Sequence, residues 1–326
     1  MLSKEKSLGN LKTFRVELTD AMRQDHFREG VLIKGDFGWS EFAPFSHHTI
    51  EHSARWLQAA LEMAWSKLPE PIEKQIKVNA ISTSPDPKKA IEILAATGCK
   101  TLKVKLNGTN LDSDIAFLEV LISAYPELIF RIDFNGSLTI NEAVSYSNRL
   151  SEFNIEYFEQ PCKSIDEIKE VKSLTNIKVA IDENLRLAND ATSSEHIKTI
   201  TDVADFVVIK PIPVGGIKRF QIIADQVIKI GKKVVVSGSM DTSIGLYETL
   251  LAQSLLGESS QLVAGAGTGS ILSTDVVAQT LRAHNGFIEI KRLEVDDSKI
   301  TESPNQKELI QRLNMSFDFG RERNWF

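Results

Sequence analysis

The sequence has few of the residues that mark secretion, membrane insertion or nucleic-acid binding. Only two of its 326 residues are cysteines, Cys99 and Cys162, too few for a disulfide framework or a thiolate metal site. No apolar run reaches the roughly 20 residues that span a bilayer, and the first residues, MLSKEKSLGNLK, lack the apolar stretch of a signal peptide. With 38 Lys and Arg against 44 Asp and Glu, the chain also lacks a basic excess for phosphate contacts. We therefore expect a cytoplasmic, enzyme-sized protein that binds neither nucleic acid nor a membrane.

Eight short β-rich runs recur in the sequence and alternate with stretches of helical spacing. Strand–helix alternation at this pace indicates βαβ units and therefore a parallel sheet. Eight such strands favour a closed (β/α) barrel over an open sheet, so the expected fold class is α/β. The runs cover residues 76–81, 101–106, 129–134, 155–160, 178–183, 206–211, 233–238 and 261–266.

The first 75 residues follow a different pattern. Residues 14–18, 28–35 and 38–42 are typical of antiparallel strands, and residues 50–67 carry apolar side chains at helical spacing. The tail beyond residue 285 is charged and weakly patterned. We predict three parts: a small α+β domain over residues 1–75, the barrel over 76–285, and a C-terminal segment over 286–326 that returns to the first domain.

Polar residues stand at the carboxyl end of most of the β-rich runs. A single charge there is explained by solvent, but one polar group in unit after unit builds a ring around the barrel mouth, where the active sites of barrels lie. The residues of this ring are Lys103, Lys105, Asp133, Asn135, Glu159, Asp182, Glu183, Lys210, Ser237 and Ser239.

Asp133, Glu159 and Asp182 come from three consecutive runs, so their carboxylates can converge on one point. Three converging carboxylates repel one another unless a cation lies between them. Oxygen ligands without a nearby His or Cys favour Mg²⁺ over Zn²⁺, and the choice between Mg²⁺ and Mn²⁺ stays open. We interpret His48 and His52, which belong to the first domain, as surface or capping residues.

Lys103 and Lys105 are two apart on one strand, so their side chains point to the same face. Two adjacent ammonium groups depress each other's pKa, and a lysine tuned in this way can act as a base near neutral pH. Lys210 arrives four units later and would face Lys105 across the metal. Metal with lysine bases is the arrangement needed to remove a proton α to a carboxylate, so the expected partner is a small carboxylate substrate.

Seven segments together resemble the enolase superfamily, its muconate lactonizing subgroup and, within it, the o-succinylbenzoate synthase family in its actinobacterial branch. The resemblance covers residues 14–280 and includes the capping-domain signature GWSEFAPF (38–45). The segments are KVKLNG (103–108), RIDFNGS (131–137), YFEQPCK (157–163), AIDENLR (180–186), IKPIPVGG (209–216), VVVSGSMDTSIGL (234–246) and VAGAGTGSILSTDVVA (263–278).

The resemblance implies a lyase of menaquinone biosynthesis. This lyase dehydrates 2-succinyl-6-hydroxy-2,4-cyclohexadiene-1-carboxylate to o-succinylbenzoate. Lys105 would take the α-proton and then protonate the departing hydroxyl, Lys210 would stabilise the enediolate as a cation, and Lys103 would lower the pKa of Lys105. The implied Mg²⁺ ligands are Asp133, Glu159 and Asp182.

The resemblance also indicates where the substrate lies. Segments 20–28 and 44–48 would close over the mouth, and Ser237 and Ser239 would hydrogen-bond the succinyl carboxylate, with Asn135 as a further substrate contact. Phe134 stands where a small residue is expected, and we predict that it packs behind its strand.

Several other functions remain as alternatives. An N-acylamino acid or N-succinylamino acid racemase would use the same two lysines, whereas a dipeptide epimerase usually carries an acidic pair at the eighth strand, where this chain has GAGTGS (265–270). Mandelate racemases need a His on strand seven, which is absent, and muconate cycloisomerisation stays open. The spacing of Gly265, Gly267 and Gly269 does not match a dinucleotide fingerprint. A non-catalytic binding protein would have no use for the lysine and carboxylate set, because buried like charges are costly.

Overall fold

The computed structural model of the chain describes residues 3–22, 25–106, 108–257 and 262–326. An antiparallel sheet near the N-terminus has the order β1–β2–β3 and packs on α2, as the sequence pattern predicts. The strands and the helix α2 cover the expected runs, although β1 and β2 begin earlier and β1 ends later, and the short helix α1 is not among the predicted elements. The elements are α1 (Lys4–Ser7), β1 (Leu11–Met22), β2 (Asp25–Gly35), β3 (Gly38–Phe42) and α2 (Ile50–Trp65).

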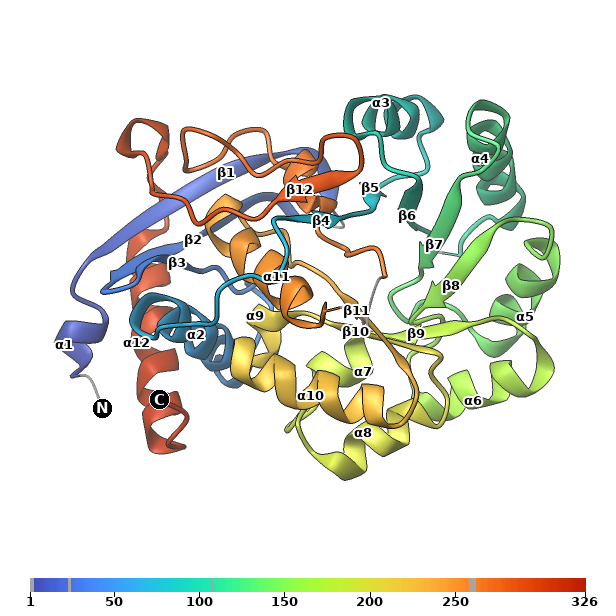
Figure 1. Cartoon of the computed structure of the whole chain (residues 1–326). Helices are drawn as coiled ribbons and strands as arrows, with labels where there is room; N and C mark the ends of the chain where they lie inside the picture. Colours follow the sequence, from blue (N-terminus) through green and yellow to red (C-terminus); the bar gives the residue numbers. More distant parts are fainter. Residues whose placement is uncertain (1–2, 23–24, 107, 258–261) are drawn as a thin grey trace.

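A second, seven-stranded sheet runs through the middle of the chain, and each of its neighbouring pairs is parallel. Its strand order, β5 to β11, follows the sequence, and helices lie around the outside of its curve (Figure 1). The strands are β5 (Ala80–Ser82), β6 (Thr101–Lys105), β7 (Ile129–Asp133), β8 (Ile155–Glu159), β9 (Val179–Ile181), β10 (Phe206–Ile209) and β11 (Lys233–Val236).

The connections between these strands contain helices, as βαβ units require. Several begin with a side-chain cap, and Thr139 and Ser164 each form a reciprocal capping box with a glutamate three residues later. The helices are α3 (Pro87–Thr97), α4 (Leu111–Ala124), α5 (Ile140–Arg149), α6 (Ile165–Leu174), α7 (Glu183–Arg186), α8 (Ser194–Thr201), α9 (Pro211–Val214), α10 (Ile217–Lys229) and α11 (Ser243–Leu255).

The eighth run differs from the expectation. Among its described residues no regular strand forms; instead Ala264 makes a single parallel bridge to Val78, and Gly265 makes one to Ser237. The chain then turns into a 3₁₀ helix, η2 (Gly267–Ile271). The α/β class is therefore observed, with seven strands and a bridging segment where eight regular strands were expected.

Glycines in this bridging segment allow three backbone segments to meet. A Cβ atom on Gly267 would lie 2.1 Å from the carbonyl oxygen of Asn79, and one on Gly265 would lie 2.6 Å from Ser237 Oγ. Neither position has space for a side chain. Close packing accounts for these two glycines without a bound dinucleotide.

Two further departures concern the ends of the barrel region. Run 76–81 divides into β4 (Gln75–Lys77), which pairs antiparallel with β12 (Phe287–Glu289), and β5. Beyond η3 (Asp297–Lys299), the weakly patterned tail forms a long helix, α12 (Gln306–Glu322), which the sequence pattern does not predict. This helix lies beside α2, where Leu313 and Phe317 join the apolar cluster of the N-terminal elements (Figure 1).

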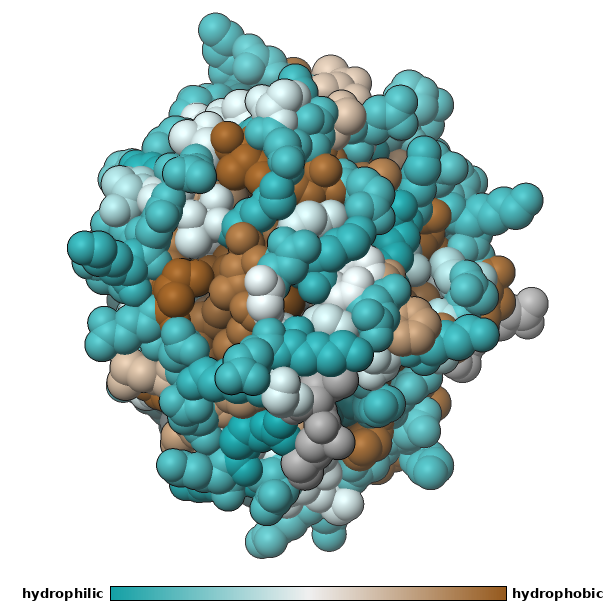
Figure 2. Space-filling view, turned by 90° about the vertical axis from the view of Figure 1, so that its left-hand side faces the viewer, coloured by the Kyte–Doolittle hydropathy of each residue, from teal (hydrophilic) through white to brown (hydrophobic). Residues whose placement is uncertain are grey.

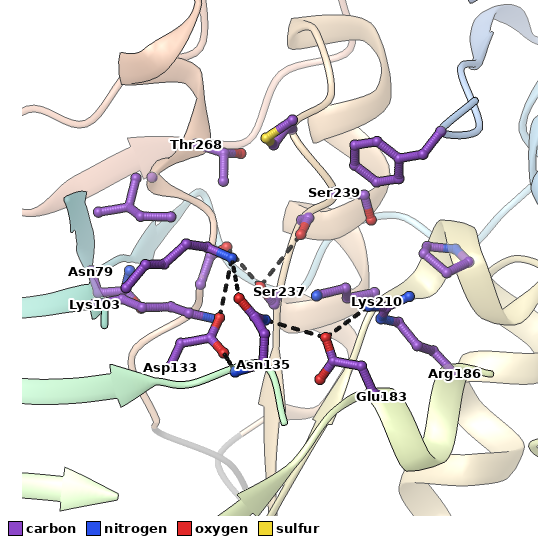
Figure 3. Close-up of a pocket in the computed structure, with 18 of the residues that line it drawn as sticks. Asn79, Lys103, Asp133, Asn135, Glu183, Arg186, Lys210, Ser237, Ser239 and Thr268 are labelled. Carbon is purple, nitrogen blue, oxygen red and sulfur yellow. Dashed lines mark hydrogen bonds and ion pairs between the residues drawn. The ribbon is translucent and has the colours of Figure 1, made fainter. Parts of the chain in front are cut away.

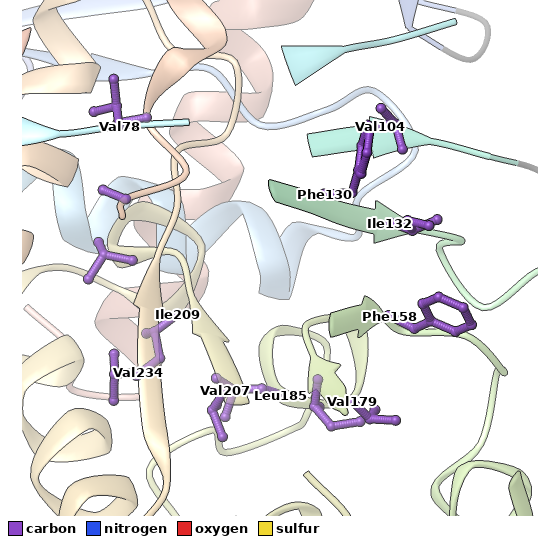
Figure 4. Packing of buried hydrophobic residues seen from close by; sticks show 14 of the residues in the cluster. Val78, Val104, Phe130, Ile132, Phe158, Val179, Leu185, Val207, Ile209 and Val234 are labelled. Atoms are coloured by element: carbon purple, nitrogen blue, oxygen red, sulfur yellow. The ribbon is translucent and has the colours of Figure 1, made fainter. Parts of the chain in front are cut away.

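The main apolar core lies between the parallel sheet and its helices (Figure 4). Val104, Ile132 and Phe158 are buried there and alternate along their strands with the polar site residues, as the two-residue period of a strand requires. Phe134 is also buried and contacts the Tyr146 and Phe158 rings edge-on, which confirms that it packs behind its strand.

The face that carries α1 and α12 is mainly hydrophilic, and hydrophobic residues are exposed in several smaller areas, the most extended one left of its centre (Figure 2). Within the part of the chain that the structure describes, no helix combines the length and the apolar character needed to cross a membrane.

Candidate active site

The carboxyl ends of five neighbouring strands bring the predicted charged residues together. Lys105, Asp133 and Glu159 are direct register partners at the ends of β6, β7 and β8. Asp182 follows β9, and Lys210 follows β10 as the first residue before α9. Because parallel strands end at the same edge of a sheet, residues far apart in sequence become neighbours here.

Lys103 lies between two of the carboxylates. Its Nζ atom is 2.9 Å from Asp133 Oδ2 and 2.7 Å from Glu159 Oε1, and its side chain is only 8% exposed. Lys105 Nζ lies 3.4 Å from the same Asp133 oxygen and donates a hydrogen bond to Asn135 Oδ1 at 3.0 Å. The Lys-x-Lys pair is therefore held by carboxylates from the two following strands.

A second set of ion pairs surrounds Asp182. Lys210 Nζ lies 2.6 Å from Asp182 Oδ2, and Arg186 Nε lies 3.1 Å from Asp182 Oδ1. Arg186 also contacts Glu183 Oε1 at 2.9 Å, and that oxygen accepts a hydrogen bond from Asn135 Nδ2. Both α7 residues belong to the AIDENLR segment. The sequence places Glu183 in the polar ring but predicts a role only for Asp182, and it does not single out Arg186.

Burial and charge act in opposite directions on these groups. Burial alone would lower the pKa of Lys103, but Asp133 and Glu159 outweigh it and raise that pKa well above its usual value. The expectation that the two ammonium groups depress each other's pKa is therefore wrong for Lys103, because it considered the neighbour on the same strand and not the carboxylates on the next two.

The three carboxyl groups also differ from one another. Burial, together with the nearby Asp133 and Asp182 carboxylates, raises the pKa of Glu159 to about 7 against the opposing effect of Lys103. Asp182 is equally buried, yet Lys210 and Arg186 lower its pKa to about 2. Lys103 and Lys105 likewise hold the pKa of Asp133 below its usual range in spite of burial.

The predicted metal ligands are adjacent but do not surround a single point. Among the described residues, no group of three or more His, Cys, Asp or Glu side chains is arranged to hold a metal ion. Lys103 lies between Asp133 and Glu159, while Asp182 is paired with Lys210 and Arg186. The donor chemistry still fits a hard divalent cation, since three buried carboxylates on adjacent strands affect one another's charge.

A pocket opens above the strand ends, with an empty volume of about 850 Å³ including the solvent at its mouth (Figure 3). Asn135, Ser237 and Ser239, the predicted substrate contacts, line it together with Lys103, Lys105, Asp133 and Lys210. Ser237 Oγ donates a hydrogen bond to the carbonyl of Gly265, whereas Ser239 Oγ is buried without a hydrogen-bond partner. The hydrogen-bonding capacity of the Ser239 hydroxyl group is therefore unused, whereas that of Ser237 is at least partly used.

The N-terminal elements close one side of this pocket. Phe45, His47 and His48 line it, which places the predicted segment 44–48 at the mouth. The prediction for segment 20–28 lies partly outside the described residues, because residues 23–24 are not described. The interpretation of His48 as a surface or capping residue is wrong. It packs among Phe45, His47, His52 and Trp56, and burial lowers its pKa to about 2.

Comparison with known proteins identifies the family. Residues 87–294 match the family model described as enolase C-terminal domain-like, and residues 14–64 match the enolase N-terminal domain-like model. The chain belongs to the enolase superfamily.

Similar proteins with curated names include o-succinylbenzoate synthases. The one from Thermobifida fusca is 33% identical over 294 residues, which is 89% of this chain and 90% of the relative. The one from Mycolicibacterium smegmatis is 32% identical over 76% of each chain, and the one from Mycobacterium tuberculosis is 30% identical over 84% of this chain and 82% of the relative.

Solved structures share the enolase-superfamily fold at lower sequence identity. A muconate lactonizing enzyme from Pseudomonas fluorescens, complexed with muconolactone, has a TM-score of 0.75 and 15% identity, and the match covers 89% of this chain and 97% of that one. A dipeptide epimerase from Enterococcus faecalis, complexed with Mg and the dipeptide L-Leu-L-Tyr, has a TM-score of 0.73 and 18% identity, with coverages of 90% and 98%.

Proposed function

We propose that this protein is a carbon–oxygen lyase that dehydrates 2-succinyl-6-hydroxy-2,4-cyclohexadiene-1-carboxylate to o-succinylbenzoate, a reaction of menaquinone biosynthesis. The observation that carries the proposal is that Lys105 and Lys210, from strand ends on different sides of the site, line one pocket together with Asp133. Relatives named o-succinylbenzoate synthase, which align with 76–89% of this chain, support the same reaction.

In this proposal Lys105 carries the proton chemistry. Its Nζ atom, oriented by Asn135 Oδ1, removes the proton α to the substrate carboxylate, and the carbon–hydrogen electron pair enters the enediolate. The enediolate then expels the hydroxyl group. Lys105 returns its proton to that group on the same face, so water leaves and the ring becomes aromatic.

Lys210 acts as a fixed cation in this scheme. Asp182 holds its ammonium group at 2.6 Å, so the positive charge stays near the developing enediolate without transferring a proton. Lys103 is the more buried member of the Lys-x-Lys pair and keeps its charge between Asp133 and Glu159. These contacts give the three lysines separate tasks.

Asp133, Glu159 and Asp182 are the residues that would hold Mg²⁺. The bound ion would supply positive charge for the substrate carboxylate as its α-carbon is deprotonated. For substrate contacts we propose the hydroxyl of Ser239, with Ser237 and Asn135 beside it, because all three residues line the same pocket.

We also propose that the parallel sheet closes into a barrel and that the chain divides into three parts. The Gly265 amide donates to the carbonyl of Val236 in the edge strand β11, and the Ala264 carbonyl accepts from the amide of Asn79, which directly precedes the other edge strand, β5. These two contacts support a closed barrel. The proposed division is a capping domain (1–75), a barrel (76–285) and a C-terminal segment (286–326). The packing of α12 on α2 supports this assignment of the tail.

The test is a spectrophotometric assay of the purified protein with the cyclohexadiene substrate, in Mg²⁺ and in excess chelator. We expect loss of the diene absorbance in Mg²⁺ and none in chelator, with activity recovered when Mg²⁺ is added back. If the protein binds Mg²⁺ but leaves the diene intact, the proposed reaction is wrong. Deuterium exchange at the α-carbon of N-succinylamino acids would then identify a racemase that uses the same two lysines.

A further inference from the structure

Arg28 is a buried arginine of β2 that the proposed mechanism does not use. It is only 3% exposed, although it lies in the N-terminal sheet and not at a strand end of the parallel sheet. Its Nε atom donates a hydrogen bond to the carbonyl of Met240 at 3.2 Å, and its Nη2 atom donates to the carbonyl of Ala43. Its guanidinium carbon also lies 4.3 Å from the centre of the Phe45 ring.

These contacts join two walls of the active-site pocket. Phe45 lines the pocket from the N-terminal side, and Met240 lines it from the loop that follows β11. One guanidinium group therefore contacts the Phe45 ring, the backbone just before it and the backbone of the opposite wall. A planar group with several fixed donors suits this position, and a lysine could not reproduce it.

The loop that Arg28 contacts has a strained backbone. Met240 has φ of +62°, in the left-handed region that residues with side chains rarely adopt. Such a conformation persists when surrounding contacts hold it, and it is common at ligand sites. Beyond Arg28, the Ser239 amide donates to Asp241 Oδ2 at 2.7 Å within the loop itself.

Glu41 holds the far end of the same loop. This buried β3 carboxyl group accepts hydrogen bonds through Oε2 from the Thr242 amide at 3.0 Å, the Thr242 hydroxyl at 2.5 Å and the Gly245 amide at 3.3 Å. Those amides belong to the first turn of α11, where backbone donors have no partner within the helix. The N-terminal sheet is thus hydrogen-bonded to the loop at Met240 and again at Thr242.

We propose that Arg28 and Glu41 form a clamp of two positioning residues through which the N-terminal sheet sets the shape of the substrate pocket. Neither residue needs to touch the substrate. They fix the loop over residues 237–242, which carries Ser239 and Met240, and Arg28 also fixes Phe45. The substrate part of this inference rests on the proposed function, since the clamp would orient the non-reacting chain of the carboxylate substrate.

The test uses Arg28→Met and Glu41→Met, which keep apolar bulk and remove the hydrogen-bonding groups. Matched controls are Arg15→Met and Glu29→Met on β1 and β2. Arg15 stacks on the Phe27 ring at 3.6 Å, and Glu29 accepts hydrogen bonds from Ser303 and Asn305, but neither contacts the site loop through these groups. Glu41→Gln keeps the acceptor and serves as the conservative variant.

The first readout is amide hydrogen exchange of the full-length protein, which needs no substrate. We expect residues 237–246 to exchange at least about tenfold faster in Arg28→Met and Glu41→Met, and at the wild-type rate in both controls and in Glu41→Gln. Unchanged exchange of this loop in the folded Met variants would overturn the clamp. If Arg28→Met does not fold, Arg28→Lys replaces it, with the same expected direction.

The second readout is steady-state kinetics with the cyclohexadiene substrate. We expect KM to rise about tenfold while kcat changes by less than about threefold, because the lysines stay in place. A fall in kcat at unchanged KM, or equal effects in the controls, would contradict positioning by the clamp. If even the wild-type protein leaves the substrate intact, the proposed function fails, and the exchange experiment still decides whether the clamp exists.

Discussion

Asp133 and Asp182 at the strand ends and Glu41 and Asp241 near the start of α11 are all buried, yet their pKa values shift in opposite directions. At the strand ends, lysines lie within ion-pair distance of Asp133 and Asp182, and the pKa of each is lowered in spite of burial. At the start of α11, burial raises the pKa of Glu41 to about 8 and also raises that of Asp241, with Arg28 as the strongest opposing cation. Burial is common to both pairs, so the balance of nearby cations and carboxylates decides the direction. The pKa of Glu159 is raised to about 7 although Lys103 lies beside it, because Asp133 and Asp182 are also near.

The opposite pKa shifts suit two different roles, one in catalysis and one in holding a loop. The lowered pKa values of Asp133 and Asp182 keep these two carboxylates ionised, which suits cation binding. The α11 group is rich in acids that face backbone amides, which suits a structural role, because a carboxyl group can accept from amide donors whether or not it is ionised. The same residue type thus supports chemistry in one place and loop geometry in the other. The following predictions test this contrast.

Removing the proposed base should have the largest effect. Lys105→Ala should lower kcat by roughly 10²–10⁴-fold, because general acid–base catalysis typically contributes that much. Circular dichroism should show an unchanged fold. Lys77→Ala, at an exposed position of β4, is the control and should keep full activity. Retained turnover in Lys105→Ala would remove this residue from the mechanism.

Asp182→Asn tests the cation-binding side of the strand-end group. The variant removes one of three carboxylate charges and should weaken Mg²⁺ binding at least roughly tenfold, since hard cations prefer charged oxygen ligands. Isothermal titration calorimetry of the purified proteins measures the change directly. Asp166→Asn, in the first turn of α6, provides a control that should bind Mg²⁺ as the wild type does. Unchanged affinity in Asp182→Asn would exclude Asp182 from the ligand set.

Glu41→Gln tests the α11 group through pH. The folded-state pKa of Glu41 is raised above the unfolded value, so its contribution to stability is present below about pH 4.5 and is lost as pH rises towards 8. A pKa that differs by one between the folded and unfolded states corresponds to about 1.4 kcal/mol. We therefore expect Glu41→Gln to gain in free energy of unfolding relative to the wild type between pH 5 and 8.

Urea unfolding at several pH values measures this difference, and Glu29→Gln is the matched control. Asp182 should show the opposite sign: its pKa is lowered, so its contribution is present above the unfolded value and is lost as pH falls through about 2. A Glu41→Gln curve that runs parallel to the wild type over this range would show that Glu41 is ionised, and the contrast between the two groups would then be wrong.

The strand-end group could be predicted from the sequence, whereas the α11 group could not. Residues such as Asp133 and Lys210 follow apolar runs at a regular interval, so the rule that parallel strands end together places them at one edge. Glu41 and Thr242 are 201 residues apart, and no local pattern links them. Arg28 likewise resembles an ordinary strand residue until the fold places Met240 beside it.

The two wrong expectations, for the pKa of Lys103 and for the C-terminal segment, both arose because contacts between distant parts of the chain were not considered. The expected pKa of Lys103 took account only of the lysine on its own strand, and it missed the carboxylates that the register of β6, β7 and β8 brings to it. The segment that forms α12 was not predicted as a helix because it is strongly polar. Its apolar residues Leu313 and Phe317 are buried by packing against α2, a contact that the local sequence does not reveal. Local periodicity predicts where helices and strands lie. Contacts between distant segments determine which side chains are buried and which are ionised.

The smallest effect we expect comes from the two serines of the clamped loop. Ser239 Oγ is buried without a hydrogen-bond partner, so a substrate carboxylate would satisfy it, and Ser239→Ala should raise KM about three- to tenfold. Ser237 Oγ already donates to the Gly265 carbonyl at 3.1 Å, and Ser237→Ala should change KM by less than about twofold. Steady-state kinetics of Ser239→Ala and Ser237→Ala measures both changes, and each variant serves as the control for the other. A larger effect at Ser237 would mean that the substrate displaces the Gly265 contact, and the binding role would pass from Ser239 to Ser237.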